Sequence, residues 1–141
     1  MACGTTPRAM AGVLMSDNTH AVGNRGEDAA CRYLEGKGYL ILDRNYRAER
    51  YEIDIVAQKD DTVIFCEVKT ARTKKFGEAV TWVTPEKIRR IADAAQEYIS
   101  ARFMEEPPCK FRFDVIGIEI DGDEARINHI ENAFSAPEDT A

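Results

Sequence analysis

The sequence predicts an α/β domain built on one sheet of about five strands, with helices packed on it. Two observations predict this class. Apolar residues recur at helical spacing in two segments, and they alternate or run continuously in five shorter ones. The segments follow the order helix, three strands, helix, two strands, which favours one sheet carrying helices. A content of 44% hydrophobic and 31% charged residues in 141 is typical of one soluble globular domain.

The helices are expected at residues 25–37 and 85–103. Thr84 supplies a capping hydroxyl for the second helix, and Pro85 takes its first position. The strands are expected at 39–42, 53–57, 63–68, 111–120 and 125–130. The fourth strand changes apolar parity near its middle, which indicates a bulge or burial on both faces.

The domain itself is expected to cover residues 21–134. Residues 1–20 lack a periodic apolar pattern and are expected to form a disordered leader, and residues 135–141 a flexible tail. The leader has no convincing signal-peptide cleavage site, and no segment approaches the roughly eighteen apolar residues of a membrane span. The four cysteines form no C-x-x-C pair and are expected to be buried thiols. A cytoplasmic protein without membrane contact is expected.

The second and third strands form a predicted hairpin with four charged side chains on one face. Side chains alternate between the faces of a strand, so Glu52 and Asp54 share a face, as do Glu67 and Lys69. If the turn lies at Asp60–Asp61, Asp54 lies opposite Glu67 and Glu52 lies opposite Lys69. The rear face is expected to pack in the core and consists of Ile53, Ile55, Ile64, Cys66 and Val68.

Two carboxylates directly opposite each other repel unless a cation lies between them. Hard divalent ions such as Mg²⁺ usually take one or two carboxylates together with water and phosphate oxygens, which fits Asp54 and Glu67. Such an ion polarises a phosphoryl oxygen, while Lys69 could orient or help deprotonate the attacking water. The alternative is the solvated face of an ordinary hairpin, with Glu52 and Lys69 as an ion pair. The E-x-K string alone is weak, because Glu35-Gly-Lys37 repeats it.

Two further charged residues each have two interpretations. Glu27 either completes a capping box with Asn24 at the start of the first helix, or leans towards Asp54 and Glu67 as a further ligand. Lys87 lies in the first turn of the second helix, where a cation opposes the helix dipole. It is therefore either aimed at phosphate or simply solvated.

The net charge of −6 opposes nucleic-acid binding on average, but the charge is unevenly distributed. Residues 69–90 carry seven basic side chains against two acidic ones, which are either a phosphate-binding region or a solvated surface. Trp82 and Phe76 could stack on bases or anchor the core. His20 and His129 have no evident partner. The expected nucleic-acid-binding residues are Arg72, Lys74, Lys75, Lys87, Arg89 and Arg90.

Together these segments resemble the UPF0102 (YraN) family, which is similar to a divergent branch of the PD-(D/E)XK nucleases related to archaeal Holliday junction resolvases. The resemblance is carried by Gly23–Glu27, Glu52–Ala57, Phe65–Thr70, Ala79–Arg89, Arg112–Val115 and Ile127–Phe134. It implies a restriction-endonuclease-like core, a central mixed β-sheet of about five strands flanked by helices. The family usually has glycine at the position of Tyr51. The tyrosine here argues against a close approach of substrate to the backbone at this point.

The resemblance also implies roles for individual residues. Asp54 corresponds to the metal-binding aspartate, Glu27 to the helix acid, and Lys87 to a later helix position that often carries Lys or Gln. The implied catalytic residues are Glu27, Asp54, Glu67 and Lys69, with Asp54, Glu67 and Glu27 as metal ligands and Glu52 as an accessory. The expected activity is that of a Mg²⁺- or Mn²⁺-dependent endonuclease acting on structured or branched DNA. A homodimer that matches a two-fold junction is also expected. The alternatives are a non-catalytic nucleic-acid-binding or scaffold protein, and a small-nucleotide hydrolase.

Overall fold

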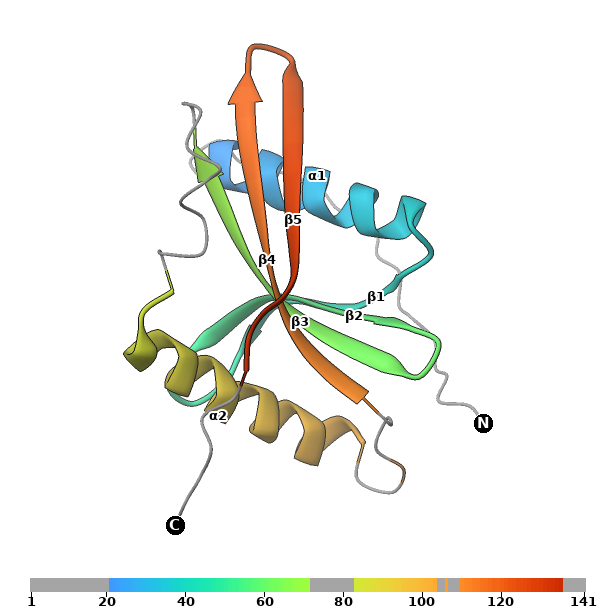
Figure 1. Cartoon of the computed structure of the whole chain (residues 1–141), viewed down its shortest axis with the longest axis vertical. Helices are drawn as coiled ribbons and strands as arrows, with labels where there is room; N and C mark the ends of the chain where they lie inside the picture. The colour runs from blue at the N-terminus through green and yellow to red at the C-terminus, as the bar shows by residue number, and fades with distance from the viewer. Residues whose placement is uncertain (1–20, 72–82, 104–105, 107–109, 136–141) are drawn as a thin grey trace.

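A computed structural model describes residues 21–71, 83–103, 106 and 110–135, whose strands form one five-stranded sheet (Figure 1). The elements are α1 (Ala21–Gly36), β1 (Leu40–Arg47), β2 (Glu52–Lys59), β3 (Thr62–Ala71), α2 (Pro85–Arg102), β4 (Lys110–Asp121) and β5 (Glu124–Phe134). Strand order in the sheet follows the order in the chain. Strands β3 and β4 run parallel and all other neighbours antiparallel, so the sheet is mixed. The predicted fold class is confirmed.

Helix α2 accounts for the one parallel pair. Parallel neighbours need a crossover connection of roughly a dozen residues or more, and the chain between β3 and β4 contains this helix. The helix starts as predicted: Thr84 is its N-cap, the Thr84 hydroxyl accepts the Lys87 N–H at 3.2 Å, and Pro85 follows. Lys87 therefore lies in the first turn of α2.

The two helices cover opposite faces of the sheet and form two hydrophobic clusters, with the twisted sheet between them (Figure 1). The α1-side cluster consists of Ala30, Cys31, Leu34, Tyr39, Ile55, Ala57, Ile64, Cys66, Ile116 and Ile118. The α2-side cluster consists of Ala48, Ile53, Val56, Val63, Phe65, Ile91, Ala94, Ala95, Tyr98 and Phe113. Cys31 and Cys66 are free buried thiols, as predicted. Neither helix in the described residues combines the length and apolar character needed to cross a membrane.

The predicted rear face of the hairpin is correct except at Ile53. Ile55, Ile64 and Cys66 pack on the α1 side, with Val68 against them. Ile53 packs instead on the α2 side, and it lies beyond Ile55–Cys66, the last backbone pair between β2 and β3. The front face of the hairpin is not an open solvated surface either, because α2 covers its half nearest the turn.

Element boundaries differ from the prediction where polar residues break the pattern. Helix α1 begins at Ala21, four residues earlier than predicted, and β1 extends to Arg47. A register shift between Ile41 and Asp43 and the polar side chains beyond it hide the second half of β1 from a hydrophobic pattern. The predicted irregularity in β4 is confirmed by its register shift near Val115 and by burial on both faces. Residues 1–20 and 136–141 lie outside the described part, so the predicted leader and tail stay predictions.

Candidate functional site

The candidate site lies where β2 separates from β3. Backbone pairs run from Lys59–Thr62 to Ile55–Cys66, in the predicted register. Beyond them the side chain of Asp54 replaces the backbone ladder, and its Oδ2 accepts the N–H of Val68 at 2.8 Å. Glu52 was predicted to lie opposite Lys69 if the ladder continued. The backbone pairs end at Ile55–Cys66, so the ladder does not pair these two residues.

Asp54 and Glu67 are partly buried, and the pKa of each carboxyl is raised. Burial and the negative charge of Glu67 raise the pKa of Asp54 to about 7, although the hydrogen bond from Val68 opposes this. Burial also raises the pKa of Glu67, against the hydrogen bond of Tyr51 and the positive charges of Lys87 and Lys69. Two such carboxylates on adjacent strands are costly for the protein by themselves.

The remaining oxygen atoms of this pair fit a hard cation. One oxygen of each carboxylate is held by a protein donor: Oδ2 of Asp54 by Val68, and Oε2 of Glu67 by the Tyr51 hydroxyl at 2.8 Å. No described residue donates a hydrogen bond to Oδ1 of Asp54 or Oε1 of Glu67. The pair therefore offers two anionic oxygens, the number that proteins commonly give to Mg²⁺.

Helix α1 brings Glu27 near the site through a close backbone contact. A Cβ atom on Gly26 would collide with the Thr70 hydroxyl of β3, so only glycine lets the helix approach here. The charge of Glu27 contributes to the raised pKa of Asp54. Oε1 of Glu27 accepts a hydrogen bond from Asn45 Nδ2 at 3.1 Å and one from Arg44 Nη2 at 3.5 Å.

The capping-box interpretation of Glu27 is wrong, because α1 begins at Ala21 and Glu27 lies beyond its first turn. Among the described residues, no group of three His, Cys, Asp or Glu side chains converges closely enough to hold a metal ion. The structure thus brings Asp54 and Glu67 together, but it turns Glu27 towards Arg44 and Asn45. Glu52 is exposed at the start of β2.

Cations approach Glu67 from two elements. Lys69 is exposed on the same strand and, two residues along, on the same face. Lys87 is partly buried in the first turn of α2, and both positive charges lower the pKa of Glu67. A fully solvated Lys87 is thereby excluded. Arg90 pairs with Glu86 at 3.1 Å, and the exposed Arg89 completes the basic residues of this end of α2.

Part of the segment that was expected to bind nucleic acid lies outside the described residues. This part contains Arg72, Lys74, Lys75, Phe76 and Trp82. Their expected roles therefore stay predictions, as does the absence of a role for His20, which also lies outside the described range.

Comparison with known proteins identifies the family. Residues 26–118 match the family described as "Uncharacterised protein family UPF0102". The chain belongs to the UPF0102 family. The matched range contains Glu27, Asp54, Glu67, Lys69 and Lys87, so the whole candidate site lies within the part that defines the family.

UPF0102 relatives match over most of their length. A UPF0102 protein of Chlorobium phaeobacteroides is 46% identical over 127 residues, which covers 85% of this chain and 98% of the relative. One from Geobacter sulfurreducens is 45% identical over 120 residues, or 84% and 92% of the two chains. Among solved structures, SfsA of Pyrococcus furiosus in complex with Ca²⁺ has a TM-score of 0.34 at 15% identity. That comparison covers 81% of this chain and 64% of SfsA.

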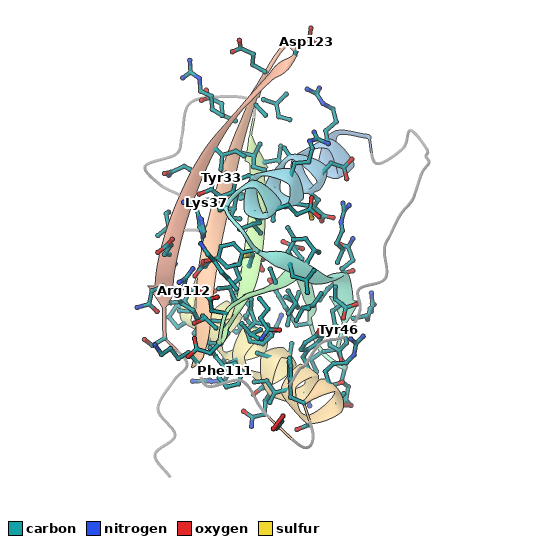
Figure 2. All side chains as sticks on the ribbon, turned by 90° about the vertical axis from the view of Figure 1, so that its right-hand side faces the viewer. Tyr33, Lys37, Tyr46, Phe111, Arg112 and Asp123 are labelled. Atoms are coloured by element: carbon teal, nitrogen blue, oxygen red, sulfur yellow. The ribbon has the colours of Figure 1, made fainter. Side chains whose placement is uncertain are left out.

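This UPF0102 chain contains a second polar cluster, centred on a fully buried Asp114 in β4. Arg112 donates two hydrogen bonds to its carboxylate, at 2.9 and 2.8 Å, and His129 lies 2.7 Å from it. The N–H of Asn132 donates a further bond at 2.9 Å. Tyr33 of α1 meets the other ring nitrogen of His129 at 3.0 Å; Figure 2 shows Tyr33 above Arg112 along the sheet. The cluster ties α1 to β4 and β5.

Sequence reasoning missed the partners in both clusters. The spacing of Arg112 and Asp114 was an available signal, because residues two apart on a strand share a face and can pair. His129 was assigned no role, yet it is almost fully buried beside Asp114. No local pattern indicates that Tyr51 reaches Glu67, since that contact joins the end of a turn to a strand sixteen residues away.

Proposed function

We propose that this chain is a divalent-metal-dependent phosphodiesterase that hydrolyses structured or branched DNA in the cytoplasm. The observation that carries the proposal is the Asp54–Glu67 pair, in which two partly buried carboxylates with raised pKa values each keep one oxygen without a donor among the described residues. Buried like charges of this kind cluster at functional sites. A bound Mg²⁺ or Mn²⁺ would stabilise them and supply Lewis-acid chemistry.

Four residues of the chain would each have a separate role in hydrolysis. The attacking water forms a new bond to phosphorus, the bond to the leaving sugar oxygen breaks, and a proton passes from water to solvent while the leaving oxygen takes one up. Asp54 and Glu67 would hold the metal, and Lys69 would orient the water. Lys87 points its charge into the same region and would offset charge developing on the phosphate.

DNA is the proposed substrate because cations gather on one side of the site. Lys87, Arg89 and Arg90 lie in the first two turns of α2, and the charge of Lys87 acts on Glu67. Phosphate contacts from such residues position a duplex without reading its sequence. A homodimer acting on two strands of a junction is part of the proposal and rests on the symmetry of such substrates.

A second candidate is a nucleic-acid-binding scaffold without catalysis. It is favoured by the contacts of Glu27, which is engaged by Arg44 and Asn45, and by the net charge of −6. A scaffold would bind the same DNA but would need no divalent metal. Cleavage and metal binding therefore separate the two candidates.

The test compares wild type with Asp54→Asn/Glu67→Gln on linear, flapped and four-way DNA in Mn²⁺. We expect wild type to cut at least one substrate, and the double variant to cut it at least roughly 100-fold more slowly, because metal and oxyanion stabilisation are lost. Thermal unfolding should show that millimolar Mn²⁺ stabilises wild type but not the variant. Asp61→Asn, an exposed change at the turn of the same hairpin, should behave as wild type. DNA binding without cutting or metal stabilisation would instead support the scaffold.

A further inference from the structure

Tyr51 is held in place through its backbone, its ring and its hydroxyl. It ends the connection between β1 and β2, where its carbonyl accepts the N–H of Ala48 at 2.9 Å. Its ring packs against the α2-side cluster, and its hydroxyl donates to Oε2 of Glu67 at 2.8 Å. The ring therefore holds the hydroxyl at a fixed place beside the proposed metal ligand.

This hydrogen bond limits how Glu67 can bind a cation. The Tyr51 hydroxyl occupies one lone pair of Oε2 and so disfavours chelation by both oxygens of Glu67, whereas Oε1 has no donor among the described residues. Asp54 is restricted in the same way, because Val68 holds its Oδ2. Both hydrogen bonds therefore favour ligation through one oxygen of each carboxylate over chelation by two.

The two common hard cations respond differently to such a restriction. Mg²⁺ requires six ligands in a near-ideal octahedron at about 2.0–2.1 Å and usually takes single carboxylate oxygens together with water. Ca²⁺ takes about six to eight oxygens at longer distances and often uses both oxygens of one carboxylate. A glutamate confined to one oxygen suits the smaller ion.

We propose that Tyr51 is a positioning residue that sets the metal preference of the Asp54–Glu67 site, by confining Glu67 to one-oxygen ligation and so favouring Mg²⁺ or Mn²⁺ over Ca²⁺. The inference rests on the proposed function, since it concerns the same metal site. It adds a residue outside the carboxylates and a property, ion discrimination, that the carboxylates alone do not determine. Removing the hydroxyl would allow Glu67 to turn and offer both oxygens.

The chain offers a matched control for this change. Tyr33→Phe also removes a hydroxyl that is hydrogen-bonded to a buried polar group, but its partner is His129 in the cluster around Asp114. Both substitutions keep the aromatic ring and its packing. A loss of stability should accompany either one, whereas a change in ion preference should accompany only Tyr51→Phe.

The experiment titrates Mg²⁺, Mn²⁺ and Ca²⁺ separately into the metal-free full chain by calorimetry, for wild type, Tyr51→Phe, Tyr33→Phe and Asp54→Asn/Glu67→Gln. We expect the ratio of Mg²⁺ to Ca²⁺ affinity to fall about tenfold in Tyr51→Phe, the size typical for loss of a residue that orients a ligand. The ratio should stay within twofold of wild type in Tyr33→Phe, and the double variant should bind none of the ions.

The outcomes separate this inference from the proposed function. If wild type binds Mg²⁺ or Mn²⁺ through Asp54 and Glu67 but Tyr51→Phe keeps the wild-type ratio, the role of Tyr51 is wrong and the metal site stands. An equal change of ratio in Tyr33→Phe would also overturn it, because the effect would then follow from stability. If wild type binds neither ion, both the metal site and the role of Tyr51 fall.

Discussion

The two carboxylate clusters of this sheet differ in how their charge is compensated. Burial alone would raise the pKa of Asp114, but hydrogen bonds from Arg112, His129 and the Asn132 N–H outweigh it and hold its pKa below the ordinary value. Asp54 has one backbone donor and a second carboxylate as its neighbour, so its pKa is raised to about 7. The neighbours of a buried carboxylate thus decide the direction in which its pKa moves.

This difference separates a structural charge from one that needs a ligand. The Asp114 cluster is complete within the chain, and it joins α1, β4 and β5. The two carboxylates of the Asp54–Glu67 pair lower the stability of the folded protein when both are charged, and a bound cation would offset this loss. Breaking each cluster should therefore have effects of opposite sign, and the following variants test this.

The largest effect is expected from Asp114→Asn. Removing the negative charge leaves the Arg112 guanidinium without its bidentate partner and weakens the contact with His129, so we expect a loss of about 3 kcal/mol in the free energy of unfolding. Urea unfolding at neutral pH measures it. Glu86→Gln, which breaks the exposed pair with Arg90, should cost no more than about 0.5 kcal/mol. Equal losses in the two variants would contradict the structural role of Asp114.

Gly26→Ala tests the helix that contacts both clusters. The added methyl meets the Thr70 hydroxyl, so we expect a net loss of about 1 to 2 kcal/mol, after the better helix propensity of alanine offsets part of the overpacking. Gly36→Ala in the same helix has open space around the new Cβ and should not destabilise. Recovery of stability in a Thr70→Ala background would assign the loss to this contact. Denaturant unfolding of wild type, the two glycine variants, Thr70→Ala and the Gly26→Ala/Thr70→Ala double variant supplies the measurement.

The fold could be predicted from the sequence because its elements are periodic and its breaks are sharp. Thr84 and Pro85 mark the start of α2, and the alternation of β2 and β3 determines the hairpin register. The facing of the two strands at Ile55 and Cys66 follows from that alternation. The second half of β1 was not predicted, because its residues are mostly polar and show no alternation of apolar side chains.

The site was predicted in its chemistry but not in its surroundings. Asp54 and Glu67 could be identified as a pair because strand geometry places them together. The contacts of Tyr51 with Glu67, and of Asn45 with Glu27, depend on a turn and on a left-handed residue at φ 53°. Such long-range contacts have no local signature, so tertiary packing alone determines them.

The smallest effect in this comparison, and the one with opposite sign, is expected for Asp54→Asn in protein kept free of metal with EDTA. The folded pKa of Asp54 lies at about 7, above its ordinary value of 3.8, so between these values the folded state binds more protons than the unfolded state. The contribution of Asp54 to the free energy of unfolding of wild type should therefore fall as pH rises from about 4 to about 7. Asparagine does not titrate and can still accept the Val68 N–H, so the variant should lose less stability over this range.

The two proteins should have nearly equal stability at pH 4.5, and the variant should be more stable by about 1 kcal/mol at pH 8, a figure reduced for the partial exposure of the site. Urea unfolding at a series of pH values measures this difference. Asp61→Asn removes an exposed carboxylate at the turn of the same hairpin and should follow the wild-type curve. Adding Mn²⁺ at pH 8 should then reverse the order, because wild type gains a ligand that the variant binds poorly. If the two curves coincide at pH 8 in EDTA, the charge on Asp54 costs the fold nothing, and the contrast with Asp114 loses its physical basis.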